Sequence, residues 1–120
     1  MLAKVTRILR ALSVVAVAAW AVVDAGAAMA QKVAVITPYL AQPGTQFYVE
    51  AFQQVARDKG WDVNVIDTAG DVAAVISRIE DMVTQQVDAI VINVDPAQVT
   101  AGLQAAKDAG IPVLGMDAGA

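Results

Sequence analysis

The stretch KVAVITPYLAQPGTQFYVEAFQQVARDKGWDVNVID, residues 32–67, decides the fold class. Its first six residues form an apolar run rich in Val and Ile, which predicts a strand, and residues 61–67 predict a second one. The apolar residues between them recur at helical spacing on one face: Tyr48, Phe52, Val55 and Ala56. Gly60 is the predicted end of this helix. The whole stretch is therefore typical of a strand–helix–strand unit.

The same alternation continues along the chain. A second helix is predicted from apolar residues at spacings of three and four: Val72, Val75, Ile76, Ile79 and Val83. Residues 88–94 and 111–116 predict two more strands, and all four strands are expected to be buried on both faces. We therefore expect an α/β fold: an open parallel sheet of four strands with three helices distributed over both faces.

The third helix has the clearest predicted start. Asp95 is expected to be its N-cap, Pro96 its first helical residue, and Gln98 the partner that completes a capping box. The predicted inner face of this helix contains three apolar residues: Val99, Leu103 and Ala106. Gly110 is expected to end the helix before the fourth strand.

The first thirty residues have the pattern of an export signal. Three basic residues (Lys4, Arg7 and Arg10) precede an apolar run at 11–23, and Ala28-Met29-Ala30 matches a signal-peptidase site. We expect a signal peptide at 1–30, followed by a partial N-terminal domain at 31–120. An uncleaved membrane anchor is the alternative, although the apolar run is shorter than the roughly 20 residues of a span and is followed by Asp24.

Composition excludes several classes of function. Residues 31–120 contain eleven acidic and five basic residues, a net charge of −6 that disfavours binding to nucleic acid. The sequence contains no Cys and no His, which excludes disulfides, the usual zinc sites and His-based catalytic triads. It also lacks the glycine-rich motifs of dinucleotide sites and P-loops. We predict no catalytic residue, no metal and no cofactor.

A ligand site is expected where the parallel strands end, because ligands of open α/β sheets bind beyond the carboxyl ends of the strands. Amide, hydroxyl and carboxylate groups suit the hydroxyl groups of a sugar, and an aromatic ring covers its apolar face. The predicted ligand-binding residues are Gln42, Thr45, Phe47, Asn93 and Asp117. Tyr48 and Phe52 are instead expected to pack the first helix onto the sheet.

Two stretches also resemble a known family: VAVITPYLAQPGTQFYVEAFQQVARDKGWDVNVIDT and DAIVINVDPAQVTAGLQAAKDAGIPVLGMDAGA. They are similar to the start of type I periplasmic substrate-binding proteins, the ribose- and galactose-binding kind that serve ABC importers. The family's amide after the third strand falls on Asn93, and its ligand-binding Asp falls on Asp117. Gln42 matches the polar residue before the loop proline, but Gly44-Thr45 stands where the family has two aromatic residues. Ala118 replaces an Arg that is common in the family.

The resemblance implies a soluble, monomeric periplasmic protein. It would bind a sugar or another small polar solute and deliver it to a membrane permease of the ABC type. We expect the 120-residue chain to be an N-terminal fragment that binds such a solute weakly by itself. Two alternatives remain: an exported α/β enzyme that acts on a carbohydrate through carboxylates such as Asp67 and Asp117, and a non-functional gene fragment.

Overall fold

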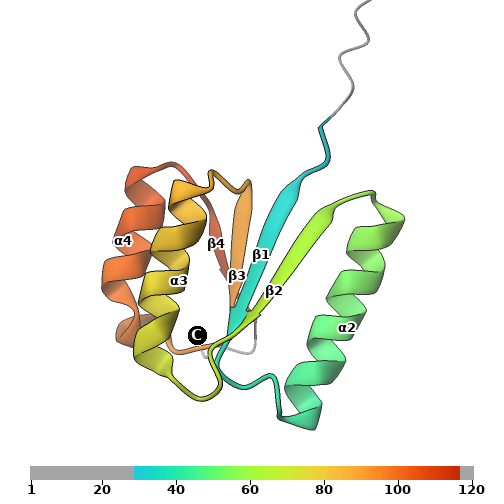
Figure 1. The fold of residues 1–120 in the computed structure, drawn as a ribbon, viewed down its shortest axis with the longest axis horizontal. Helices are drawn as coiled ribbons and strands as arrows, with labels where there is room; N and C mark the ends of the chain where they lie inside the picture. Colours follow the sequence, from blue (N-terminus) through green and yellow to red (C-terminus); the bar gives the residue numbers. More distant parts are fainter. Residues whose placement is uncertain (1–28, 117–120) are drawn as a thin grey trace, which may run out of the picture.

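The computed structural model describes residues 29–116, and their chain path is drawn in Figure 1. The elements in chain order are β1 (Lys32–Thr37), α2 (Pro43–Asp58), β2 (Asp62–Asp67), α3 (Val72–Thr84), β3 (Ala89–Ile92), a 3-10 turn η1 (Pro96–Gln98), α4 (Thr100–Asp108) and β4 (Val113–Gly115). Within this described part, no helix is both long and apolar enough to cross a membrane. The predicted signal peptide lies almost entirely outside the described residues.

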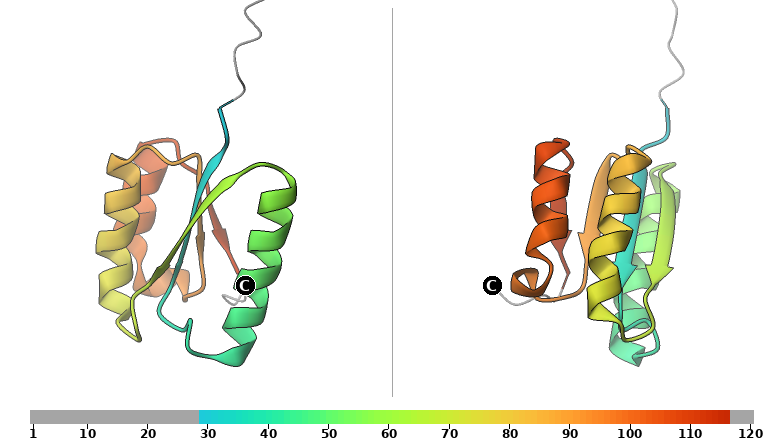
Figure 2. Two further views of the ribbon diagram at one scale, coloured as in Figure 1. Left: turned by 45° about the vertical axis from the view of Figure 1, so that its right-hand side comes forward. Right: turned by 60° about the vertical axis from the view of Figure 1, so that its left-hand side comes forward.

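The four strands of the described residues run parallel in one sheet, in the order β2-β1-β3-β4. Val33 of β1 is in register with Val63 of β2 on one side and with Ala89 of β3 on the other. Helix α2 covers one face of the sheet, whereas α3 and α4 lie side by side on the opposite face (Figures 1 and 2). The prediction of a four-stranded parallel α/β sheet with helices on both faces is confirmed.

The sheet separates two hydrophobic cores, because successive side chains of a strand point to opposite faces. Ala34 and Ile36 of β1 belong to the core under α3 and α4, whereas Val33 and Val35 belong to the core under α2. The core under the two helices also contains the following buried residues: Val75, Ile79, Met82, Val87, Ile90, Ile92, Val94, Val99 and Ala106. Val49 and Val91 complete the buried part of the other core.

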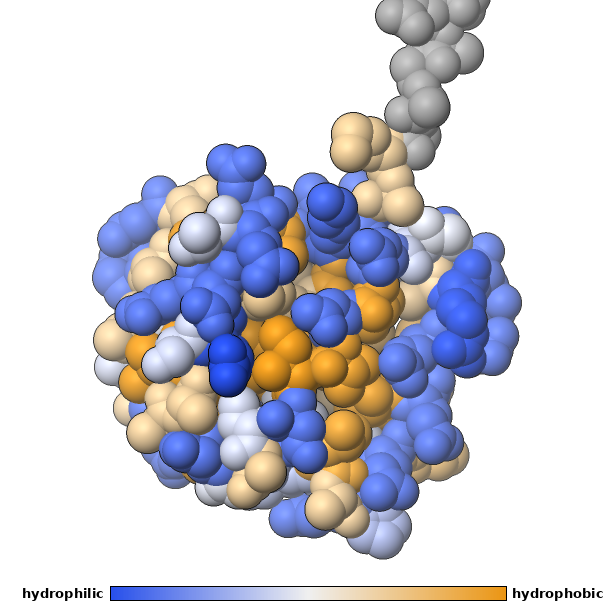
Figure 3. Space-filling model, in the orientation of Figure 1, coloured by the Kyte–Doolittle hydropathy of each residue, from blue (hydrophilic) through white to orange (hydrophobic). Residues whose placement is uncertain are grey.

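The expectation that every strand is buried on both faces is wrong for the two outer strands. In the central strands, residues 33–37 of β1 and 90–92 of β3 are all buried. The residues of β2 are either exposed or half-buried, and Leu114 of β4 is 57% exposed. The cause is the strand order, which leaves β2 and β4 at the sheet edges of the described residues. Figure 3 shows an apolar band over β2, between the polar surfaces of the helices.

The inner face of α2 differs from the predicted one. Phe52 and Ala56 pack toward the sheet as expected, but Tyr48 and Val55 are 44% and 52% exposed. The residues on the inner side instead follow a consistent helical spacing of four, three and four: Thr45, Val49, Phe52 and Ala56. The prediction counted only large apolar residues and therefore misplaced the inner face of α2. Thr45 lies on this face, whereas Tyr48 does not.

The helix predicted to begin at Pro96 begins at Thr100. Asp95 does accept a hydrogen bond from a backbone N–H, that of Ala97, but this bond caps the 3-10 turn η1. Val99 lies between η1 and α4, has a φ of −129° and is fully buried. The predicted capping box of Asp95 and Gln98 therefore does not belong to α4. Val99 and Ala106 are buried and Leu103 packs against the same core as predicted, so the 3-10 turn changes where the helix begins but not its inner face.

The three α-helices of residues 29–116 end in the same motif. Each has a residue with positive φ at the second position after the helix: Gly60, Gln86 and Gly110. The next residue donates its N–H to a carbonyl five positions earlier, as in a Schellman motif: Trp61 to Ala56, Val87 to Met82 and Ile111 to Ala106. Sequence analysis identified both glycines. It missed the end of α3, where glutamine takes the left-handed conformation at φ 55°.

Replacing Gln86 with glycine is expected to raise the free energy of unfolding by about 0.5–1 kcal/mol. The left-handed backbone costs a residue with a Cβ atom about 1–2 kcal/mol, and the greater entropy of glycine in the unfolded chain cancels part of the gain. Urea denaturation measures the difference. The matched control is Gln85→Gly, one position earlier at φ −77°, which we expect to destabilise the protein. Stabilisation by both substitutions would contradict the explanation.

Candidate functional site

The candidate site lies at the carboxyl ends of β1 and β3. These two strands are neighbours in the sheet, yet the chain leaves β1 toward α2 on one face and leaves β3 toward α4 on the other. This divergence is a topological switch point, where open α/β sheets bind their ligands. The residues at this position are Thr37, the last residue of β1, and Asn93, which follows β3 directly. Figures 1 and 2 show the strand ends gathered at one edge of the molecule.

A continuous chain of hydrogen bonds joins the ends of three strands, and we call it the strand-end relay (Tyr39, Thr37, Asn93 and Met116). The backbone N–H of Tyr39 donates to Thr37 Oγ1 at 3.0 Å, and this hydroxyl donates to Asn93 Oδ1 at 3.1 Å. Asn93 Nδ2 then donates to the carbonyl oxygen of Met116, after β4, at 2.9 Å. Thr37 is fully buried and Asn93 is 6% exposed. The relay is uncharged and satisfies polar groups that the sheet would otherwise bury unpaired.

The backbone reinforces the same arrangement. Asn93 N–H donates to Ile36 O of β1 at 3.3 Å, and Met116 N–H donates to Ile92 O of β3 at 2.8 Å. The main chain thus continues the sheet pairing one residue beyond β3 and one residue beyond β4, and the side chains of the relay bridge the same strands. This double connection explains why two polar side chains are buried at the end of two strongly apolar strands.

The predicted ligand-binding residues within the described part of the chain lie at two structural elements. Asn93 lies in the strand-end relay, whereas Gln42, Thr45 and Phe47 lie at the N-terminus and in the first turn of α2. Gln42 is the exposed N-cap residue, and its side chain makes no capping bond. Thr45 is 6% exposed on the sheet side of α2. Asp117 lies outside the described residues.

Phe47 lies on the outer side of α2 and is 70% exposed. Its ring contacts Tyr48 in an edge-to-face arrangement, with ring centroids 6.1 Å apart. The expectation that Tyr48 packs the helix onto the sheet is therefore wrong, and the two rings form an exposed aromatic pair at the start of α2. Such a pair offers an exposed apolar surface on α2.

Sequence analysis missed the role of Thr37. Its signal is a hydroxyl at the end of a strand that is otherwise apolar, a position where a polar group needs a nearby partner. Asp67, proposed as a carboxylate of an enzyme, accepts the N–H of Ala69 at 2.8 Å and shapes the turn after β2. Asp71 caps α3 by accepting from Ala74. Both carboxylates therefore have local structural roles, and residues 29–116 contain no cluster of His, Cys, Asp or Glu suited to a metal ion.

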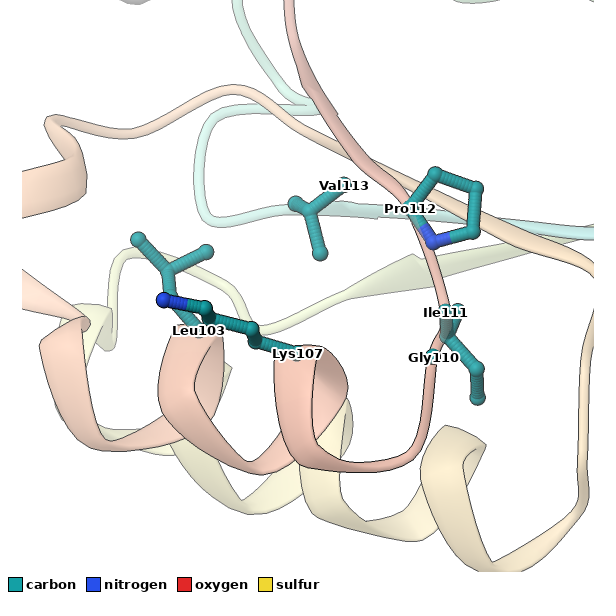
Figure 4. Close-up of a pocket in the computed structure, with 6 residues that line it drawn as sticks. All are labelled: Leu103, Lys107, Gly110, Ile111, Pro112 and Val113. Carbon is teal, nitrogen blue, oxygen red and sulfur yellow. The ribbon is translucent and has the colours of Figure 1, made fainter.

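A groove of about 490 Å³ lies elsewhere, between the second half of α4 and the chain entering β4 (Figure 4). Its lining residues are Leu103, Lys107, Gly110, Ile111, Pro112 and Val113. Residues 110–112 precede β4, so the groove is at the amino end of that strand and not at the strand-end relay. Its lining is mostly apolar with a single ammonium group, which does not match the mixed donors and acceptors expected for a sugar site.

Comparison with known proteins identifies the family. The family model described as periplasmic binding protein domain matches residues 33–120. The chain is 29% identical over 69 residues to the ribose import binding protein of Bacillus subtilis (strain 168). That match covers 57% of this chain and 23% of the relative.

Solved structures agree with this match. An ABC transporter solute binding protein from Mycobacterium smegmatis with bound glycerol superposes with a TM-score of 0.68 and 29% identity, over 73% of this chain and 31% of the other. The 5-methylthioribose transporter solute binding protein from Thermotoga lettingae, in complex with 5-methylthioribose, superposes with a TM-score of 0.67 and 27% identity. This match covers 74% of this chain and 29% of the other. The chain spans about a quarter to a third of the length of these relatives. Because the family match extends over most of the chain, and the parallel sheet agrees with it, this chain belongs to the periplasmic binding protein domain family.

Proposed function

We propose that the chain is part of the substrate-binding component of an ABC import system. The observation that carries this proposal is the family match over residues 33–120. The relatives described above are named as binding proteins for import or transport. The proposed role is therefore binding without catalysis, and the partner is a permease in the inner membrane. The protein is proposed to act as a monomer, without nucleic acid.

The proposed ligand is a small polar solute with several hydroxyl groups. Glycerol and 5-methylthioribose occupy the two solved relatives, and the curated relative is named for ribose. The strand-end relay supports such a ligand, because Asn93 carries both a donor and an acceptor and a hydroxyl group needs both. Gln42, Thr45, Phe47 and Asp117 are proposed as further contacts around it.

The proposed location is the periplasm, after removal of the signal peptide at Ala30. The basic residues, apolar run and small-x-small site of residues 1–30 support export. N-terminal sequencing of the exported protein tests this location. A chain that begins at Gln31 is expected, and a chain that retains Met1 in the membrane fraction would contradict the cleavage.

Isothermal titration calorimetry of the exported chain with D-ribose, glycerol and 5-methylthioribose is expected to show a Kd of about 1 mM or weaker. A well-formed pocket buries 70–90% of a small ligand, whereas the strand-end relay occupies one edge of a single sheet. Few contacts therefore contribute to the affinity. A micromolar Kd would contradict the prediction of weak binding by this chain.

A matched pair of variants separates specific binding from background. Asn93→Leu is expected to abolish the heat signal, whereas Asn64→Leu on the exposed side of β2 is expected to preserve it. Because Asn93→Leu also affects folding, circular dichroism must first show that the sheet and helices remain. Turnover of any of the three solutes during the titration would instead favour the exported enzyme considered in the sequence analysis.

A further inference from the structure

The direction of every hydrogen bond in the strand-end relay is fixed by its two ends. At one end, the Met116 carbonyl oxygen can only accept, so the Asn93 amide must present Nδ2 to it. Oδ1 of the same amide then faces Thr37. At the other end, the N–H of Tyr39 can only donate, and it donates to Thr37 Oγ1. The proton of the hydroxyl is thereby left for Asn93 Oδ1.

Reversing the Asn93 amide would break its contact with Met116 and reverse the direction of its bond with Thr37. Oδ1 would then face the Met116 carbonyl, acceptor against acceptor, and Nδ2 would face the Thr37 hydroxyl. Thr37 Oγ1 would accept from both neighbours and its proton would have no partner among them. An unpaired polar group costs about 1–3 kcal/mol when it is buried, and Thr37 is fully buried. The relay therefore selects one orientation of the amide.

We propose that Thr37 is a positioning residue, which sets the Asn93 amide in the orientation that meets a ligand. An amide has two donor hydrogens and two acceptor sites, and the relay uses one of each. One N–H of Nδ2 and one lone pair of Oδ1 remain. This pair complements a ligand hydroxyl, which donates and accepts at the same oxygen. The inference rests on the proposed function and deepens it, because it names the hydroxyl as the recognised group.

The positioning itself is testable without ligand, by NMR of the exported chain labelled with 15N. Thr37→Val keeps the shape of the side chain and removes the hydroxyl. The side-chain amide protons of Asn93, which donate to Met116, are expected to shift and to exchange with water about tenfold faster, because the amide loses the Thr37 bond at Oδ1 that holds it in place. Thr37→Ser restores the hydroxyl, and is expected to restore the shifts and the slow exchange. Unchanged Asn93 signals in Thr37→Val, or no rescue by Thr37→Ser, would overturn the proposal.

A matched control and a second measurement keep the result unambiguous. Thr84→Val removes an exposed hydroxyl that bonds Glu80 O within α3, and is expected to leave the Asn93 signals unchanged. If Thr37→Val does not fold, hydrogen exchange in the unmodified chain still tests the bond between Thr37 and Asn93. The hydroxyl proton of Thr37 is expected to exchange slowly enough to be observed, and rapid exchange beside protected Asn93 amide protons would overturn the relay.

The role of Thr37 in binding is tested by titrating the protein with D-ribose and glycerol and following the Asn93 side-chain NMR signals. The affinity is expected to fall about tenfold in Thr37→Val and to return in Thr37→Ser. Equal affinities of the unmodified chain and Thr37→Val would overturn the positioning role in binding. If neither solute perturbs the unmodified chain, the proposed function fails for these ligands, and the exchange measurement still decides whether Thr37 orients Asn93.

Discussion

Replacing Ile79 with alanine is expected to lower the free energy of unfolding by about 4 kcal/mol, within the range measured for buried Ile and Leu truncations. Ile79 is fully buried at the middle of α3, in the core between the sheet and α4. Its side chain fills the space beside Gly102 of α4: a Cβ atom on that glycine would lie 3.0 Å from Ile79 Cδ1 and 3.2 Å from Ile79 Cβ. Shortening Ile79 leaves a cavity between two helices that are held close together.

Urea denaturation followed by tryptophan fluorescence measures the loss, because Trp61 is the single tryptophan of residues 31–120. Trp61 is half-buried in the core under α2, so its signal reports on the opposite side of the sheet from the substitution. A matched control is Val55→Ala, an apolar truncation on the exposed side of α2, which we expect to change stability by about 0.5 kcal/mol or less. Similar losses for both variants would contradict the assigned core.

The same contact predicts coupling between Ile79 and Gly102. Gly102→Ala alone is expected to cost stability, because the contacts at 3.0–3.2 Å outweigh the helix propensity of alanine, worth about 1 kcal/mol. In the Ile79→Ala background the Cδ1 contact at 3.0 Å is gone, the Cβ contact at 3.2 Å can relax into the space left by the truncation, and the new methyl group partly fills the cavity. We therefore expect Gly102→Ala to be neutral or stabilising there, with a coupling energy of about 1–2 kcal/mol. Additive effects of the two substitutions would contradict the close packing.

The sequence predicted the fold well where one physical signal dominates. The apolar runs gave all four strands, and the spacing of residues 72–83 gave α3 with the correct inner face. The prediction failed where tertiary context decides. The edge positions of β2 and β4 follow from strand order, which local apolar content does not specify. The 3-10 turn before α4 was also missed, because a capping Asp followed by Pro can begin a 3-10 turn as well as an α-helix.

The location of the candidate site was predictable from the sequence, but the hydrogen bonds within it were not. Parallel strands put their carboxyl ends at one edge, so the location near Asn93 followed from the topology alone. The bonds of Asn93 to Thr37 and Met116 span 56 and 23 residues of sequence, and no local pattern encodes such pairs. The position of Tyr48 outside the core also required the structure, since the helical register could be counted in more than one way.

Replacing Asn93 with leucine is expected to lower the free energy of unfolding by about 3 kcal/mol, although leucine is close to asparagine in size. The substitution removes the partner of the Thr37 hydroxyl and of the Met116 carbonyl together, and a buried polar group left unpaired costs about 1–3 kcal/mol. Asn64→Leu is the matched control, the same chemical change at an exposed position of β2, with an expected change of about 0.5 kcal/mol or less.

The double variant Thr37→Val/Asn93→Leu distinguishes loss of the relay from a general defect of packing. With both side chains apolar, the Thr37 hydroxyl no longer exists to be left unpaired, so the two losses are expected to sum to about 1 kcal/mol more than the double variant shows. Strictly additive losses would mean that the two side chains stabilise the sheet independently. A sub-additive result assigns the stability to the bond between the ends of β1 and β3, the same bond that orients the amide at the proposed ligand site.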